Sequence, residues 1–78
     1  MDIQKWADRM NRIHREISEA WYDADPLLPN ELASAVSAWA REAEDDWLRQ
    51  IARMNGKLLG SGILLTHDSN EVHVHFKS

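Results

Sequence analysis

The feature that most constrains this chain is an unbroken seam of apolar residues near its start. Seven apolar side chains recur at steps of three and four: Ile3, Trp6, Met10, Ile13, Ile17, Ala20 and Ala24. Such steps put side chains on one face of a helix, and a strict seam over three heptads is typical of a helix that packs against one other helix. The spacing therefore predicts a helix over residues 3–24, with Asp2 as its N-cap.

A second apolar stripe predicts another helix over residues 31–54. The stripe comprises Leu32, Val36, Trp39, Ala43, Trp47, Ile51 and Met54. Asn30, directly before it, is a good N-cap residue. Asn55 followed by Gly56 is a common signal for the end of a helix.

The segment between the two helices, residues 25–30, is expected to be a loop. Pro26 and Pro29 each disfavour the helical conformation in the residue before them. Leu27 and Leu28 lie between the prolines, and apolar side chains are not typical of a solvated linker, so we expect them to cover one end of the core. Two helices of similar length joined in this way predict an antiparallel αα-hairpin.

The C-terminal segment, residues 57–77, has the pattern of a β-hairpin. Residues 58–66 are typical of a strand whose start is softened by glycine, and residues 72–76 alternate strictly between apolar and polar. Pairing Thr66 with His73 gathers the apolar side chains on one face, whereas a one-residue slip would mix the faces. This apolar face, which we expect to pack on the helices, comprises Ile63, Leu65, Val72, Val74 and Phe76.

These elements predict one small α+β domain over residues 1–78, an αα-hairpin followed by a C-terminal β-hairpin packed on it. A domain of this size buries only about 60% of the surface of its unfolded chain, so a second copy is a common source of stability, here possible through a joined sheet. The chain has no Cys, which excludes disulfides and Cys-ligated metals. It has no signal-peptide pattern and no apolar run of about 20 residues, so a cytoplasmic location and no membrane contact are expected.

The charge of the chain makes direct nucleic-acid binding an unfavourable hypothesis. Nine Lys and Arg stand against thirteen Asp and Glu, a net charge of −4, while phosphate contacts need clustered basic residues. The densest acidic run lies in the second helix, where Glu42, Asp45 and Asp46 are expected to point outward. This run is either a solvated helix face or a docking surface for a basic partner.

The four tryptophans divide into two groups. Trp6, Trp39 and Trp47 fall on the apolar stripes, which predicts that they are core residues. Trp21 lies off the seam and is followed by Tyr22. This aromatic pair either caps the core together with the leucines of the loop, or forms a contact site for a partner, since aromatic residues dominate the energetics of protein interfaces.

The pair His73 and His75 is the most chemical-looking feature of the chain. Two imidazoles two residues apart on one face of a strand can share a metal ion, although a zinc site normally needs a third protein ligand, which the sequence does not identify. The other interpretations are a solvated strand face and a pH-sensitive surface. Beyond this metal hypothesis, the sequence predicts no cofactor.

The hypothesis that fits these features best is a small protein-binding module, not an enzyme. Such a module would act stoichiometrically, as an inhibitor or adaptor of another protein or of a protein–nucleic acid complex. Small acidic proteins of phages and other mobile elements often act in this way, including anti-CRISPR and anti-restriction inhibitors, an analogy of size and charge only. The alternatives are a metal-binding or metal-sensing module that uses His73 and His75, and a structural homodimer.

Overall fold

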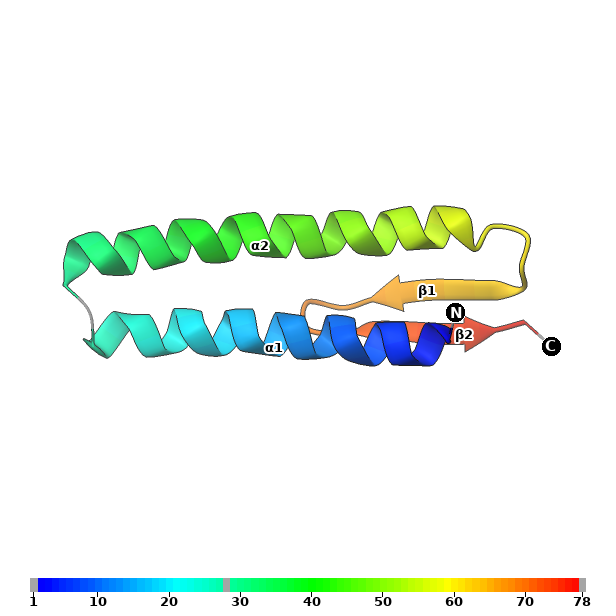
Figure 1. Cartoon of the computed structure of the whole chain (residues 1–78), viewed down its shortest axis with the longest axis horizontal. Coiled ribbons are helices and arrows are strands. Elements are labelled where there is room, and N and C mark those ends of the chain that lie inside the picture. The colour runs from blue at the N-terminus through cyan, green and yellow to red at the C-terminus, as the bar shows by residue number, and fades with distance from the viewer. Residues whose placement is uncertain (1, 28, 78) are drawn as a thin grey trace.

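Two long antiparallel helices with a β-hairpin packed against one side make up the fold (Figure 1). The computed structural model describes residues 2–27 and 29–77, without the side chains of residues 23–27. The elements are α1 (Ile3–Leu27), α2 (Asn30–Lys57), β1 (Ile63–His67) and β2 (Val72–Phe76). The predicted α+β architecture of an αα-hairpin and a β-hairpin is confirmed.

Helix α1 begins as predicted but ends later. The Asp2 Oδ1 atom accepts hydrogen bonds from the N–H groups of Gln4 (3.0 Å) and Lys5 (3.3 Å), which makes Asp2 the N-cap. The predicted end at residue 24 is wrong, because the helix continues through Pro26 to Leu27. Proline keeps a helical φ itself, and in the last turn it removes only one hydrogen bond. The expectation that the loop leucines cover the core lies outside the described residues.

Helix α2 is longer than the predicted 31–54 at both ends. Its N-cap is Pro29, without a side-chain hydrogen bond, so the prediction of Asn30 as the N-cap is wrong. The helix also passes through Gly56 and ends at Lys57. Asn55 is not an end signal here, because its carboxamide hydrogen-bonds the backbone of Leu65.

The first strand is shorter than predicted, since residues 58–62 form turns rather than strand. Gly60 and Gly62 have φ angles of 85° and 84°, in the left-handed region that glycine adopts without steric cost. These two glycines turn the chain back from the end of α2, so that β1 can begin at Ile63.

The predicted register of the β-hairpin is confirmed. Thr66 pairs with His73, Leu65 with Val74 and Ile63 with Phe76. Gathering the apolar side chains on one face was therefore sufficient to fix the pairing.

The hydrophobic core lies where the β-hairpin covers the two helices, and both helices and both strands contribute to it. Its buried members are Ile3, Ala7, Met10, Trp47, Ile51, Met54, Leu65 and Val72. Trp47 is only 2% exposed, and its Nε1 donates a hydrogen bond to the Met10 carbonyl at 2.8 Å. Figure 1 shows the β-hairpin over the right-hand part of the helices, so the loop-side part has no third layer.

The buried face of α1 is rotated from the predicted seam. Ile3, Met10 and Ile17 are buried as expected, but the residues buried between them are Ala7 and His14. The predicted seam residues Trp6, Ile13 and Ala20 lie to the other side, where Trp6 is half-buried and the others are exposed. The β-hairpin causes this rotation, because it adds a second apolar neighbour on the side of Ala7 and His14.

Several predicted core residues are exposed. Trp39 is 51% exposed and Leu32 is 53% exposed, because both lie on the side of α2 that faces away from the β-hairpin. Phe76 is 66% exposed, at the end of β2. Two of the three tryptophans assigned to the core, Trp6 and Trp47, do pack there.

Over the residues that the structure describes, neither α1 nor α2 contains a stretch apolar enough to cross a membrane.

Candidate interaction surfaces

The α1–α2 pair has two sides, and each carries a groove. We call the side on which the β-hairpin packs the sheet side, and the opposite one the open side. Ile17 lines both grooves, because it lies in the seam between the helices. Both grooves are lined only by side chains of α1 and α2.

The sheet-side groove lies on the loop side of the β-hairpin and has a volume of about 280 Å³. Its lining combines apolar and polar side chains: His14, Ile17, Ser18, Trp21, Ser37, Ala40, Arg41 and Glu44. This volume lies at the lower end of the range of ligand pockets, so the groove has room for one or two side chains of a protein rather than for a large ligand.

Trp21 and Tyr22 stand at this groove as an exposed aromatic pair. Trp21 is 46% exposed and Tyr22 is 70% exposed, and their ring centroids are 5.2 Å apart with the planes tilted by 55°. The Trp21 Nε1 donates a hydrogen bond to Ser37 Oγ at 3.0 Å, which connects the end of α1 to α2. The indole is thus held in one orientation although almost half of its surface meets solvent.

His14 forms the inner wall of the same groove, and only 6% of it is exposed. Its ring lies 4.6 Å from the Trp47 ring, and its Nδ1 is 3.5 Å from Ser18 Oγ. Its Nε2 is 3.8 Å from Glu44 Oε1, a half-exposed carboxylate at the rim of the groove. Glu44 thus gives the groove a negative group, and Arg41, which also lines it, gives it a positive one.

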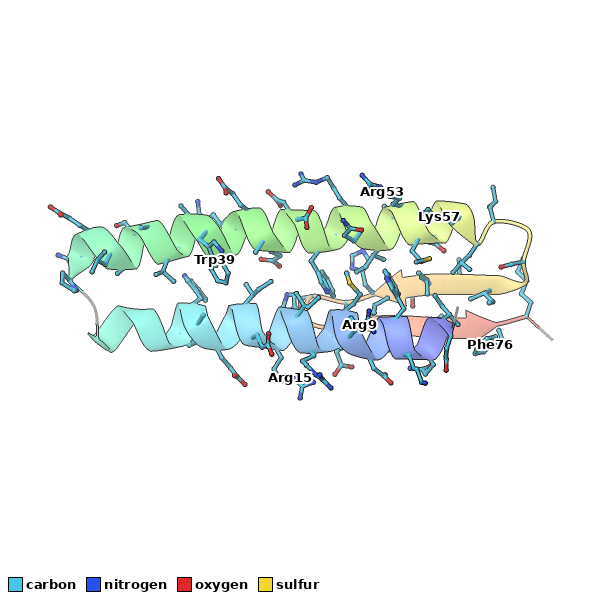
Figure 2. The ribbon with its side chains drawn as sticks, in the orientation of Figure 1. Arg9, Arg15, Trp39, Arg53, Lys57 and Phe76 are labelled. Atoms are coloured by element: carbon cyan, nitrogen blue, oxygen red, sulfur yellow. The ribbon has the colours of Figure 1, made fainter. Side chains whose placement is uncertain are left out.

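The open-side groove is more apolar and measures about 290 Å³. Its lining comprises Met10, Ile13, Glu16, Ile17, Trp39, Ala43, Asp46, Trp47 and Gln50. Ile13 is 40% exposed and Trp39 is 51% exposed, although both lie on the predicted apolar stripes. Figure 2 shows Trp39 beside this groove, between the two helices.

Charge is distributed unevenly along the open side. Arg9, Arg53 and Lys57 lie toward its β-hairpin end, as Figure 2 shows. Glu16 and Asp46 line the groove nearer the middle, one from each helix. The open side is therefore basic at one end, acidic at the middle and apolar toward the loop.

The predicted acidic docking residues do not form a single patch with the aromatic pair. Asp46 lies at the open-side groove and is 4.0 Å from the Arg49 guanidinium, in an exposed ion pair. Glu42 and Asp45 are exposed on α2, and neither lines the sheet-side groove. The acidic residue that does join Trp21 is Glu44, which the sequence did not single out.

His73 and His75 lie on the exposed face of β2, and both side chains contact other groups of the β-hairpin. His73 Nε2 is 3.1 Å from Asp68 Oδ2, and His75 Nε2 is 2.8 Å from Thr66 Oγ1. Among the side chains that the structure describes, no group of three His, Asp or Glu is arranged to hold a metal ion. The geometry thus adds no third ligand to the pair.

A signal for the position of Trp21 does exist in the sequence. Ala7, His14 and Trp21 are seven residues apart, so they form a row beside the predicted seam. Because His14 is polar, a search for apolar periodicity does not find this row. The row nevertheless faces α2 and the β-hairpin.

Comparison of this chain with known protein families, with curated proteins and with solved structures gives no match. The chemistry of the two grooves is therefore deduced from the residues that line them.

Proposed function

We propose that this chain is a small protein-binding module that acts stoichiometrically, as an inhibitor or adaptor of a larger protein assembly. The observation that carries the proposal is the exposed aromatic pair, Trp21 and Tyr22, whose indole lines the sheet-side groove and is hydrogen-bonded to Ser37. Tryptophan and tyrosine are the residues most enriched among those that dominate binding energy at protein interfaces.

The hydrogen bond from Trp21 to Ser37 supports this proposal through its effect on the cost of binding. A side chain that is free in solution loses rotamer entropy when a partner immobilises it, about 0.5–1.5 kcal/mol. Because Ser37 already holds the indole, a partner that packs on Trp21 meets a surface in its bound conformation. Exposure without mobility is the property expected of a binding residue rather than of a core residue that failed to be covered.

The groove beside the pair indicates the chemistry of the partner surface. Its floor contains Ile17 and Ala40, which favour a small apolar side chain, and Glu44 and Arg41 give its lining one charge of each sign. A partner that places an apolar side chain between an acidic and a basic one would fill the groove and match both charges. The proposal includes phage inhibitors of host defence, by analogy of chain size and net charge only.

Affinity capture from the cells that express the chain naturally tests the proposal. We expect a discrete protein to be retained by the wild type, and its retention to fall at least about 30-fold with Trp21→Ala, the loss typical of a dominant interface residue. Leu64→Ala is the matched control, because Leu64 is also 46% exposed but lies on β1, away from the groove. Circular dichroism establishes that each variant is folded. Equal retention of the same proteins by Trp21→Ala and wild type would overturn the proposal.

A further inference from the structure

The open side of the helices carries apolar side chains that the fold leaves partly uncovered. Ile13 and Ala20 are exposed at seven-residue spacing along α1, on the flank away from the buried Ala7 and His14, whereas Trp6, seven residues before Ile13, is half-buried against the core. Helix α1 therefore has two apolar flanks, and only one of them is fully covered within the chain. We propose that a second copy of this chain covers the open side, packed antiparallel to the first around a two-fold axis that crosses α1 at Ile13.

The open side is large enough for a stable homodimer. The molecule measures 51 × 20 × 16 Å, and Figure 1 looks down its shortest axis onto the open side. A face with these outer dimensions has room for the roughly 800 Å² that each partner contributes to a standard interface. Stacking two such faces would make a four-helix bundle with a β-hairpin on each outer side.

The charges on α1 select the antiparallel arrangement. Arg9 and Glu16 lie on the same flank, with Ile13 between them at steps of four and three. A two-fold axis through Ile13 places Arg9 of each copy opposite Glu16 of the other, which gives two complementary pairs in a self-complementary interface.

The antiparallel register also gives Trp39 a partner. Met10 and Trp47 are level, because Trp47 Nε1 donates to the Met10 carbonyl, so the axis at Ile13 crosses α2 between Ala43 and Trp47. At about 1.5 Å per residue, Trp39 of one copy then lies near Gln50 and Arg53 of the other. The Arg53 guanidinium can pack on the exposed indole as a cation–π pair.

This homodimer is independent of the proposed function. It uses the open side, whereas Trp21 and Tyr22 lie at the sheet-side groove and stay outside the bundle. Loss of dimerisation would leave the partner-binding surface intact, and loss of partner binding would leave the dimer intact.

Sedimentation velocity of the full chain over a wide range of concentrations tests the proposal. We expect a species of twice 9.0 kDa. Arg9→Glu and Glu16→Arg should each weaken dimerisation by about tenfold or more, because two attractive pairs become repulsive. An equimolar mixture of these two variants should dimerise again, since every pair is then complementary. Arg15→Glu is the matched control, because Arg15 lines a hollow on the sheet side together with Asn70 and Glu71, and Figure 2 shows it at the edge of α1 that is turned away from α2.

A chain that stays monomeric at every concentration would overturn the proposal. So would a dimer whose dissociation constant responds equally to Arg9→Glu and to the Arg15→Glu control. A dimer that the two single variants weaken but their mixture does not restore would overturn the antiparallel register. Circular dichroism of each variant establishes that the helices are retained.

Discussion

The side chain of Asn11 in α1 holds both backbone groups of Val72 in β2. The Val72 N–H donates to Asn11 Oδ1 at 2.7 Å, and Asn11 Nδ2 donates to the Val72 carbonyl at 3.3 Å. Asn55 in α2 makes the same two contacts with Leu65 in β1, each at 3.1 Å. Each carboxamide thus stands where the peptide of a neighbouring strand would be, and the two helices fasten opposite edges of the β-hairpin.

Replacement of either asparagine by alanine should destabilise the fold. Val72 and Leu65 are each 3% exposed, so their backbone groups would lose partners without gaining full access to water. We expect Asn11→Ala and Asn55→Ala each to lower the free energy of unfolding by about 1–3 kcal/mol, measured by urea denaturation. Asn30→Ala, at an exposed position that caps no helix, is the control and should change it by less than about 0.5 kcal/mol. An equal effect at all three positions would contradict the role of the two carboxamides.

These contacts argue against a dimer through a joined sheet, which was one expectation from the sequence. A second copy that added a strand beside Val72 or Leu65 would have to displace Asn11 or Asn55. A dimer through the open side of the helices leaves both contacts in place, which is a further reason to prefer it.

Trp47→Phe should separate the hydrogen bond of this residue from its bulk. The indole is 2% exposed and donates to the Met10 carbonyl at 2.8 Å, while phenylalanine keeps an aromatic ring but has no N–H. We expect a loss of about 1–3 kcal/mol in the free energy of unfolding, from the unmade hydrogen bond and the smaller ring together. Trp21→Phe, which loses an exposed hydrogen bond, should cost less than half as much. If urea denaturation showed a larger loss of unfolding free energy for Trp21→Phe than for Trp47→Phe, the core would not be centred on Trp47.

The turn of the β-hairpin predicts a specific dependence of stability on acid pH. Hydrogen bonds from the Asn70 N–H, the His73 imidazole and the Glu71 N–H lower the pKa of Asp68 from 3.8 to about 2. A carboxyl whose pKa is lower in the folded state contributes fully above its unfolded pKa and loses that contribution as the pH falls. Stability should therefore decline between pH 3.8 and about 2 on account of Asp68.

Asp68→Asn tests this dependence, because asparagine can still accept the two backbone hydrogen bonds but does not titrate in this range. We expect the melting temperature of the variant to fall less steeply than that of the wild type across the same acid interval. Parallel curves for the two proteins would show that other carboxyl groups account for the acid sensitivity.

Sequence patterns predict well those features of the fold that depend on a single neighbouring strand or turn. The register of the β-hairpin follows from placing Leu65 and Val74 on one face, and Asp2 caps α1 because its side chain reaches the next turn. The loop was predicted less well, since Pro26 is compatible with the last turn of a helix but incompatible with its middle.

Which side chains line the candidate surfaces depends on how α1, α2 and the β-hairpin pack together. The periodicity of a single helix does not predict this packing. The seam through Ile13 and the row through His14 are both compatible with helical spacing, and only the position of the β-hairpin decides which is buried. Trp39 was expected in the core for the same reason. Ile13 and Trp39, which a single periodicity misplaces, are residues that the fold leaves exposed.

Site-specific photocrosslinking at Tyr22 tests most directly whether the exposed aromatic pair binds another protein. A benzophenone amino acid at position 22, irradiated in the cells that express the chain naturally, should give one discrete adduct heavier than the chain or its dimer. The same group at Leu64, which is exposed but distant from the groove, should not give that adduct. No adduct from position 22, or the same adducts from both positions, would contradict the proposed function.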